Sequence, residues 1–319
     1  MMRSIRTVTR LLLPTVLVAL TGCASLPDMT PYRDATLQLR SAVVAGGSAV
    51  QSGLESAAAS YEAGDPTAKQ IKEKADRFST DWRARIEGAD ALLAYTEAVT
   101  DLALSGTQGE ASARSLANAL TGLATGVGVV LPPAGAVAAV TDVAAFVYGH
   151  IAAARAAKSL DQALQSAQPA VDRLATVLSQ DLQASLDILH AARRLQATAL
   201  ALKYNEETAY LKTLAKERKT IYGKDSLTPA DEQRLRQIVD LFEATREWRD
   251  PMEQAQAAME ADYRLRIQLI NATHGAVAEW AGAHRSFAAA VREKRSVNVE
   301  ALVQATLEAK ELVRRLRAL

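Results

Sequence analysis

A single cysteine, Cys23, occurs in the 319 residues of this chain. A disulfide framework needs an even number of cysteines, so the sequence excludes a small fold held together by disulfides. Aromatic residues make up only 5% of the chain, and proline and glycine are sparse outside a few clusters. Alanine, leucine and charged residues dominate instead, and this bias is typical of long helices and coiled coils.

Strand signals are also missing, because neither regular alternation of apolar and polar residues nor a series of glycine-rich turns occurs. We therefore predict an all-α protein, an elongated bundle of long, coiled-coil-like helices. Pro31, Pro66 and Pro229 each suit the first position of a helix. Thr228 and Asp231 resemble a capping box around the last of these starts. The predicted helices cover residues 31–63, 66–105, 169–222, 229–295 and 296–319.

Three features inside these helices lead to more specific expectations. Gly46 and Gly47 form a weak point in the first helix, because glycine costs about 1 kcal/mol relative to alanine. Pro169 is expected to kink or restart the chain, and Pro251 to kink the helix that contains it. Residues 169–222 contain no other proline or glycine, and one helix of that length would span about 80 Å. Such a helix requires an elongated bundle.

Motifs that carry chemistry are absent. The sequence contains no G-x-S-x-G, no Walker-type G-x-x-x-x-G-K and no H-E-x-x-H. Asp187 and His190 have the spacing found in di-iron bundles, but such sites need a second motif of this kind, which is absent. His274, Glu279 and His284 follow at steps of five, which turns successive side chains about 140° apart on a helix. We predict that the protein is not an enzyme and that it has no cofactor and no metal site.

The N-terminal residues have the pattern of a targeting signal. A basic segment with Arg3, Arg6 and Arg10 is followed by ten mainly apolar residues, 11–20, a run too short to span a membrane. The segment ends in Leu20-Thr-Gly-Cys23, which resembles the lipobox of bacterial lipoprotein precursors. The resemblance implies cleavage between Gly22 and Cys23 and acylation of Cys23, as with palmitate. Residues 1–22 are then the signal peptide and 23–30 a lipidated tether.

The residue after the cysteine is Ala24 rather than aspartate, and in Gram-negative lipoproteins this implies the periplasmic side of the outer membrane. Removal of residues 1–22 takes away three arginines and no acid, which leaves 34 basic and 36 acidic residues. This balance provides no electrostatic surface for nucleic acid. The expected partners are the membrane, through the N-terminal lipid, and other proteins or further copies of the chain.

Residues 115–154 form an unusual segment within the predicted single domain, 31–319. Residues 115–141 carry no charged side chain, and Pro132 and Pro133 lie near the middle, which predicts a helical hairpin. Gly122 and Gly126 would allow two helices to approach closely. The architecture is similar to that of the cytolysin A-like α-helical pore-forming toxins, in which a bundle hides an apolar hairpin. The hairpin could be buried, contact a membrane or dock a protein.

These features lead to three functional hypotheses. The first is a lipid-anchored envelope protein with a structural, scaffold or interaction role and no enzymatic activity. The second is a membrane-active protein that uses the 115–154 hairpin in the manner of an α-pore toxin. The third is a helical-bundle sensor of a small ligand, for which the sequence offers no site.

Overall fold

The computed structural model describes residues 28–105, 111, 114, 116–119, 121 and 159–318. Their main helices are α1 (Thr30–Ala59), α2 (Pro66–Ser105), α5 (Leu160–Lys203), α6 (Asn205–Tyr222), α7 (Pro229–Ala244), α8 (Arg246–Glu293) and α9 (Glu300–Leu316). No strand occurs in the described part of the chain. The prediction of an elongated all-α bundle is confirmed.

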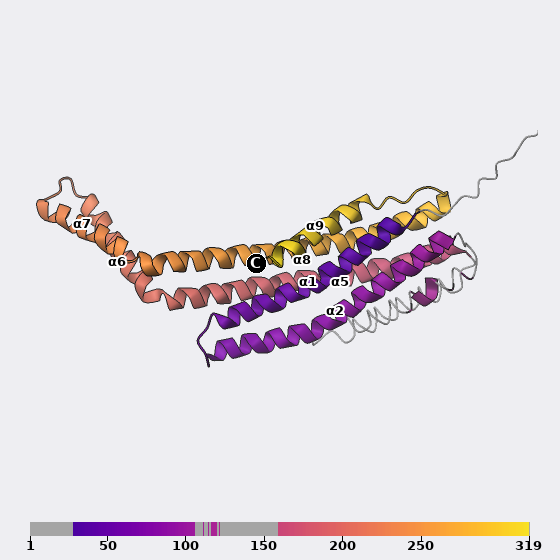
Figure 1. Ribbon diagram of the computed structural model, residues 1–319, viewed down its shortest axis with the longest axis horizontal. Helices are drawn as coiled ribbons and strands as arrows, with labels where there is room; N and C mark the ends of the chain where they lie inside the picture. Colours follow the sequence, from indigo (N-terminus) through magenta and orange to yellow (C-terminus); the bar gives the residue numbers. More distant parts are fainter. Residues whose placement is uncertain are drawn as a thin grey trace, which may run out of the picture.

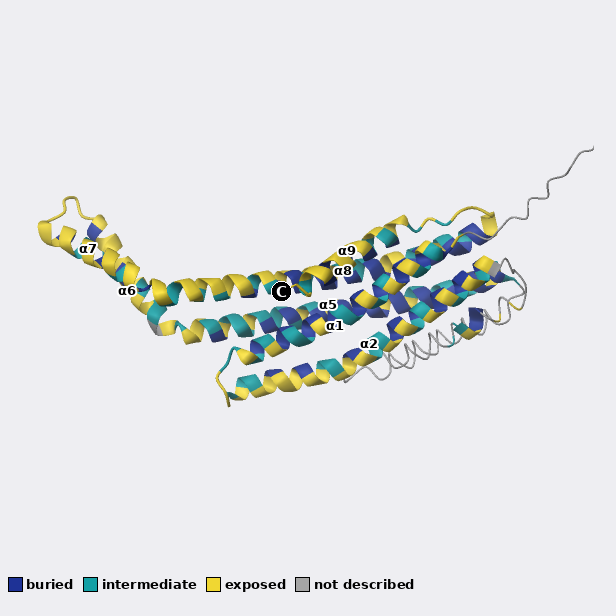
Figure 2. Ribbon diagram, in the orientation of Figure 1, coloured by how far each residue is buried: buried dark blue, intermediate teal, exposed yellow. Residues whose placement is uncertain are grey.

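The long helices run side by side along the molecule, and α6 and α7 project from one end (Figure 1). Helix α1 contacts α2, α5, α8 and α9, while α5 and α8 pack along each other. The N-terminal end of α1 lies at the end of the bundle opposite α6 and α7 (Figure 1). With 48 residues, α8 is about 70 Å long and sets the length of the body. Buried side chains line the inside of the bundle, whereas α6 and α7 are largely exposed (Figure 2).

The restart expected at Pro169 was wrong, because α5 begins at Leu160 and continues through this proline, whereas the alternative, a kink, stays a prediction. A proline inside a helix removes one hydrogen bond and costs about 3 kcal/mol. Leu164, Ala167 and Val171, on either side of Pro169, are fully buried. The packing of this apolar face outweighs the local cost and keeps the helix continuous.

The single helices predicted for 169–222 and 229–295 were also wrong, because each is divided in two. The first divides at Tyr204 and the second at Thr245, six residues before Pro251. Each junction residue is hydrogen-bonded on both sides. The Tyr204 amide donates to Leu200 and its carbonyl accepts from Thr208, and the Thr245 amide donates to Leu241 and its carbonyl accepts from Arg249. These junctions set off α6 and α7 as an arm, residues 205–244, with a core of its own made by Leu214, Ile221 and Ile238.

The helix starts predicted at Pro66 and Pro229 are confirmed. At the start of α2, the Thr67 amide donates to the Asp65 carboxylate at 2.6 Å. At the start of α7, the Asp231 amide donates to the Thr228 hydroxyl at 3.2 Å, and the Thr228 amide donates to the Asp231 carboxylate at 3.1 Å. These two bonds form the predicted capping box. The Lys224 ammonium and the Thr228 groups together lower the pKa of Asp231 to about 2.

Thr228→Ala is therefore expected to destabilise the first turn of α7 by about 1 kcal/mol, because the helix loses its side-chain cap. Hydrogen exchange of the amides in that turn measures the loss. Thr213→Ala is the matched control, because the Thr213 hydroxyl only bonds a carbonyl within α6. Equal protection of the turn in the two variants would contradict a stabilising role for the capping box.

The glycine pair in α1 does not interrupt the helix, which continues through Gly46 and Gly47. The indole ring of Trp82 lies directly against Gly47, where an added methyl group would overlap it. The Trp82 indole N–H donates to the Val43 carbonyl at 3.0 Å. At Gly47 the chain therefore makes a close packing contact that joins α1 to α2.

Candidate functional site

The most elaborate polar arrangement in the described residues is a hydrogen-bonded chain inside the bundle. The Tyr95 hydroxyl, from α2, is hydrogen-bonded to His284 Nε2, from α8. His284 Nδ1 lies 2.7 Å from the Gln168 side-chain oxygen, from α5. The Gln168 amide nitrogen donates to the Asp172 carboxylate at 2.8 Å. The polar chain, as we call Tyr95, His284, Gln168 and Asp172, thus connects three helices and ends at a partly exposed carboxylate.

The charge state of the polar chain follows from its burial. Burial, assisted by the positive charge of Arg285, lowers the pKa of His284 to about 3. Burial also raises the pKa of Tyr95 well above its ordinary value. Both side chains are therefore neutral near pH 7. A neutral imidazole has one donor and one acceptor. With the Gln168 oxygen as acceptor, Nδ1–H donates to Gln168 and Nε2 accepts the proton of Tyr95.

Aromatic side chains surround one end of the polar chain. Trp280 packs against Tyr32 and Tyr95, with ring centroids 6.4 and 6.5 Å apart. Its indole N–H donates to the Thr96 hydroxyl at 3.4 Å. Tyr32 is fully buried, and its hydroxyl has no hydrogen-bond partner among the described residues. Burial raises the pKa of Tyr32, so this phenol too is neutral.

The polar chain is enclosed, because Tyr95 and His284 are both 0% exposed. A general base must come within hydrogen-bonding reach of its substrate, and this imidazole already has a partner on each nitrogen. Each bond joins a different pair of helices, and buried polar groups strongly favour arrangements that satisfy them. The polar chain therefore fixes the register of α2, α5 and α8.

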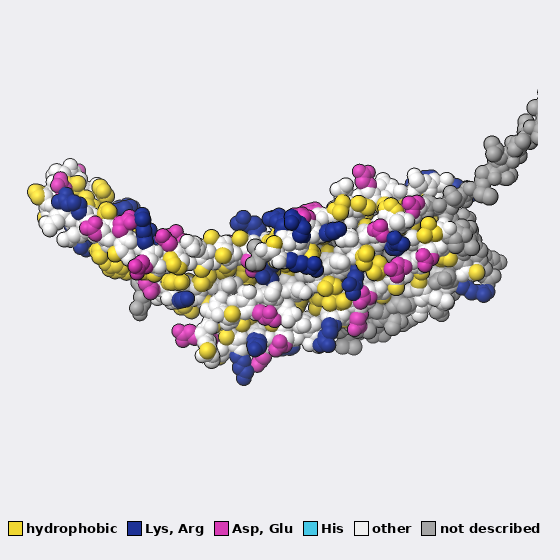
Figure 3. Space-filling view, viewed as in Figure 1, with side chains coloured by type: hydrophobic (Ala, Val, Ile, Leu, Met, Phe, Trp, Pro, Cys, Tyr) yellow, Lys and Arg dark blue, Asp and Glu magenta, His cyan; other side chains and the backbone are white. Residues whose placement is uncertain are grey.

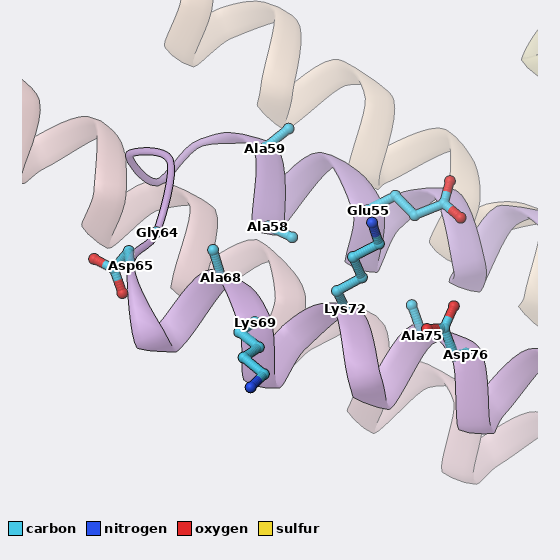
Figure 4. Close-up of a pocket in the computed structure, with 10 residues that line it drawn as sticks. All are labelled: Glu55, Ala58, Ala59, Gly64, Asp65, Ala68, Lys69, Lys72, Ala75 and Asp76. Atoms are coloured by element: carbon cyan, nitrogen blue, oxygen red, sulfur yellow. The ribbon is translucent and has the colours of Figure 1, made fainter.

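Several hollows lie on the surface of the described part of the chain, and two of them lie beside the long helices of the body. One, of about 670 Å³, lies between the end of α1 and the start of α2 (Figure 4). Ala58, Ala68 and Ala75 contribute its apolar lining, and charged side chains surround them. Figure 4 shows Lys69 pointing away from the hollow. A second hollow, of about 600 Å³, lies between α5 and α8 beside Asp172 and Arg285. Thr176, Ser179 and His274 also line the second hollow, where the Thr176 hydroxyl donates to the Asp172 carbonyl at 2.9 Å.

Most of the residues proposed from the sequence cannot be placed. Cys23, Gly122, Gly126, Pro132 and Pro133 lie outside the described residues. The signal peptide, the acylation and the hairpin therefore remain predictions. No helix among the described residues combines the length and apolar character needed to cross a membrane.

The remaining sequence candidates can be placed. The described part of the chain contains no group of three or more potential ligands that could hold a metal ion. Asp187 is exposed and His190 partly buried on α5. His274 lines the hollow between α5 and α8, whereas His284 belongs to the polar chain.

Sequence reasoning missed the polar chain and the arm. Tyr95 and His284 are 189 positions apart, and Gln168 and His284 are 116 apart, so no local pattern connects them. Large exposed apolar side chains are concentrated in and beside the arm, at Leu202, Tyr210, Tyr222, Leu227 and Val239. In the sequence they are indistinguishable from residues that pack in the body.

Among known proteins, no family model, curated protein or solved structure matches this chain.

Proposed function

We propose that this protein is a lipid-anchored scaffold of the bacterial envelope, without enzymatic activity, that holds its arm at a distance from the membrane carrying its lipid. The observation that carries the proposal is the placement of the two ends. Helix α1 begins at one end of the bundle, only seven residues after Cys23, and the arm projects from the opposite end (Figure 1).

The body of the molecule suits a spacer. Its core extends along the long helices, and ion pairs join neighbours along its length. Arg85 and Asp181 connect α2 to α5 at 3.1 Å, and Arg193 and Glu260 connect α5 to α8 at 2.8 Å. A rod with such contacts keeps its two ends apart. The arm, with Tyr210 and Val239 exposed on it, is the part suited to contact a protein partner.

The interior of the helical bundle also supports a structural role. The buried part of the polar chain, Tyr95 and His284, is neutral, and both nitrogens of the imidazole are hydrogen-bonded. In a Gram-negative cell, Ala24 after the lipidated cysteine favours the outer membrane, with the body in the periplasm. Attachment to a membrane and protein contact through the arm are the two activities that we propose.

The proposal is tested with the full-length chain in its native envelope, compared with Cys23→Ser. A photo-crosslinking side chain at Val239 probes the arm, and one at Leu37 probes the body near the tether. We expect Val239 to give a discrete protein adduct that is lost in the Cys23→Ser background, together with release of the chain from the membrane fraction. Membrane retention of Cys23→Ser, or adducts from Leu37 alone, would contradict the proposal.

A further inference from the structure

The outward face of α6 carries three exposed lysines, Lys212, Lys216 and Lys219. At 3.6 residues per turn they fall within an arc of about 60°. The uncharged Thr213, Ala215 and Thr220 lie between and beside them. In the part of the chain that the structure describes, none of these three lysines lies within 4.0 Å of a carboxylate. The three lysines thus form a strip of positive charge on the arm, the end of the molecule where Figure 3 shows basic, acidic and hydrophobic side chains together.

In the sequence the same segment is a run of mixed charge, Lys216-Glu-Arg-Lys219, which is typical of a solvated helix face. The structure divides this run between two faces. Glu217 pairs with Arg234 of α7 at 2.7 Å, and the Arg218 guanidinium lies 5.7 Å from the centre of the Phe242 ring. Both residues are therefore engaged with α7, and only the lysines remain on the outward face.

Apolar side chains adjoin the lysines at the tip of the arm. Tyr222, three positions after Lys219, is 65% exposed, and Leu227 in the following loop is 41% exposed. Tyrosine and lysine both suit the boundary between water and lipid, because each combines an apolar body with a polar end. Lysines near the surface of an anionic membrane each contribute to adsorption.

We propose that the lysine strip, with Tyr222 and Leu227, binds the surface of an anionic phospholipid bilayer. Charge complementarity at the strip itself argues for this occupant, since its three lysines have no carboxylate within 4.0 Å among the described residues. The arm as a whole carries seven basic and eight acidic residues, so the positive charge is local to the strip. The shape agrees, because the strip lies on a protruding arm. The hollows at the base of the arm are lined by Glu207 and Thr208 and not by the three lysines, so a broad surface fits the strip better than a peptide does. This binding requires no lipid on Cys23 and stands independently of the proposed scaffold role.

The test uses the chain from Ala24 onward, which keeps every described helix and lacks the signal segment. Sedimentation with phosphatidylcholine vesicles, with and without phosphatidylglycerol, measures binding at low salt. The arm variant is Lys212→Gln, Lys216→Gln, Lys219→Gln. The control is Lys69→Gln, Lys72→Gln, Lys74→Gln, which removes the same charge from exposed positions of α2.

Wild type and control are expected to bind vesicles that contain phosphatidylglycerol, and the arm variant to bind on the order of 100-fold more weakly, because each lysine strengthens adsorption about fivefold. Binding should also weaken as salt is added. Equal binding by the two variants, or no preference for anionic vesicles, would overturn the proposal. Binding to polyglutamate without binding to vesicles would also overturn it and would indicate an acidic protein partner.

A second measurement locates the contact. The chain from Ala24 onward contains no cysteine, so Ser226→Cys carries a polarity-sensitive dye at the tip of the arm. Ser296→Cys carries the same dye in the exposed loop between α8 and α9. The proposal predicts a blue shift on anionic vesicles from the dye at position 226 and none from position 296. A shift at position 296 alone would place the contact elsewhere and overturn it.

Discussion

Acidification is expected to remove about 5 kcal/mol of folding free energy through His284 alone, between pH 6.5 and pH 3. The pKa of His284 falls from an ordinary 6.5 to about 3 in the folded protein, because burial disfavours the imidazolium and Arg285 repels it. In that interval the unfolded chain binds a proton that the folded chain does not. The contribution of His284 is therefore fully present above pH 6.5 and is lost as the pH falls toward 3.

Protonation would also break the hydrogen-bond pattern of the polar chain. An imidazolium has two donors and no acceptor, so Nε2 could no longer accept the Tyr95 proton. The Gln168 oxygen would still accept from Nδ1, but both hydrogen-bond partners of the ring, Tyr95 and Gln168, are uncharged. Because nothing in direct contact offsets the buried charge, the fold resists protonation until the pH is very low.

Chemical denaturation at several pH values, compared between wild type and His284→Gln, tests this expectation. At pH 7 the variant should be less stable by about 1 to 3 kcal/mol, since it loses well-formed buried hydrogen bonds. By pH 4 wild type should have lost about 3 kcal/mol that the variant does not lose, so the difference between them closes or reverses. His274→Gln is the control and should show the acid response of wild type. A constant difference between wild type and His284→Gln from pH 7 to pH 4 would exclude a depressed pKa for His284.

The parts of this fold that the sequence predicts correctly depend on neighbouring residues. Pro66 after Asp65, and Pro229 between Thr228 and Asp231, mark helix starts because the groups that satisfy the first amides are only a few positions away. The all-α class follows from composition over the whole chain. Both kinds of signal are local or averaged, so they can be read without knowledge of the tertiary structure.

The errors arise where tertiary packing decides the outcome. Pro169 continues a helix because both its flanks are buried, and burial cannot be read from the proline itself. Tyr204 and Thr245 end helices although neither is proline or glycine, and the packing of α6 against α7 accompanies both junctions. The polar chain also depends on tertiary packing, since Tyr95 and His284 meet only after α2 and α8 have packed. The lysine strip could not be recognised from the sequence either, because only the structure shows that Glu217 and Arg218 contact α7 and leave the lysines on the outward face.

Gly47→Ala is expected to destabilise the protein by about 3 kcal/mol, although alanine is the better helix former by about 1 kcal/mol. The added methyl group would overlap the Trp82 ring, which is only 5% exposed and packs against Phe78 with 5.3 Å between ring centroids. Relief requires the indole to move, and this would also weaken its 3.0 Å hydrogen bond to the Val43 carbonyl.

Gly275→Ala provides the matched control, because it makes the same substitution inside α8. No atom beyond the helix's own backbone lies within 4 Å of the methyl group that it adds. This variant should therefore gain up to about 1 kcal/mol from helix propensity. Thermal or urea unfolding of both variants should give shifts of opposite sign. Since the two substitutions are chemically identical, a stabilised Gly47→Ala would mean that α1 and α2 do not pack with Trp82 seated on Gly47, and the α1–α2 register would have to be revised.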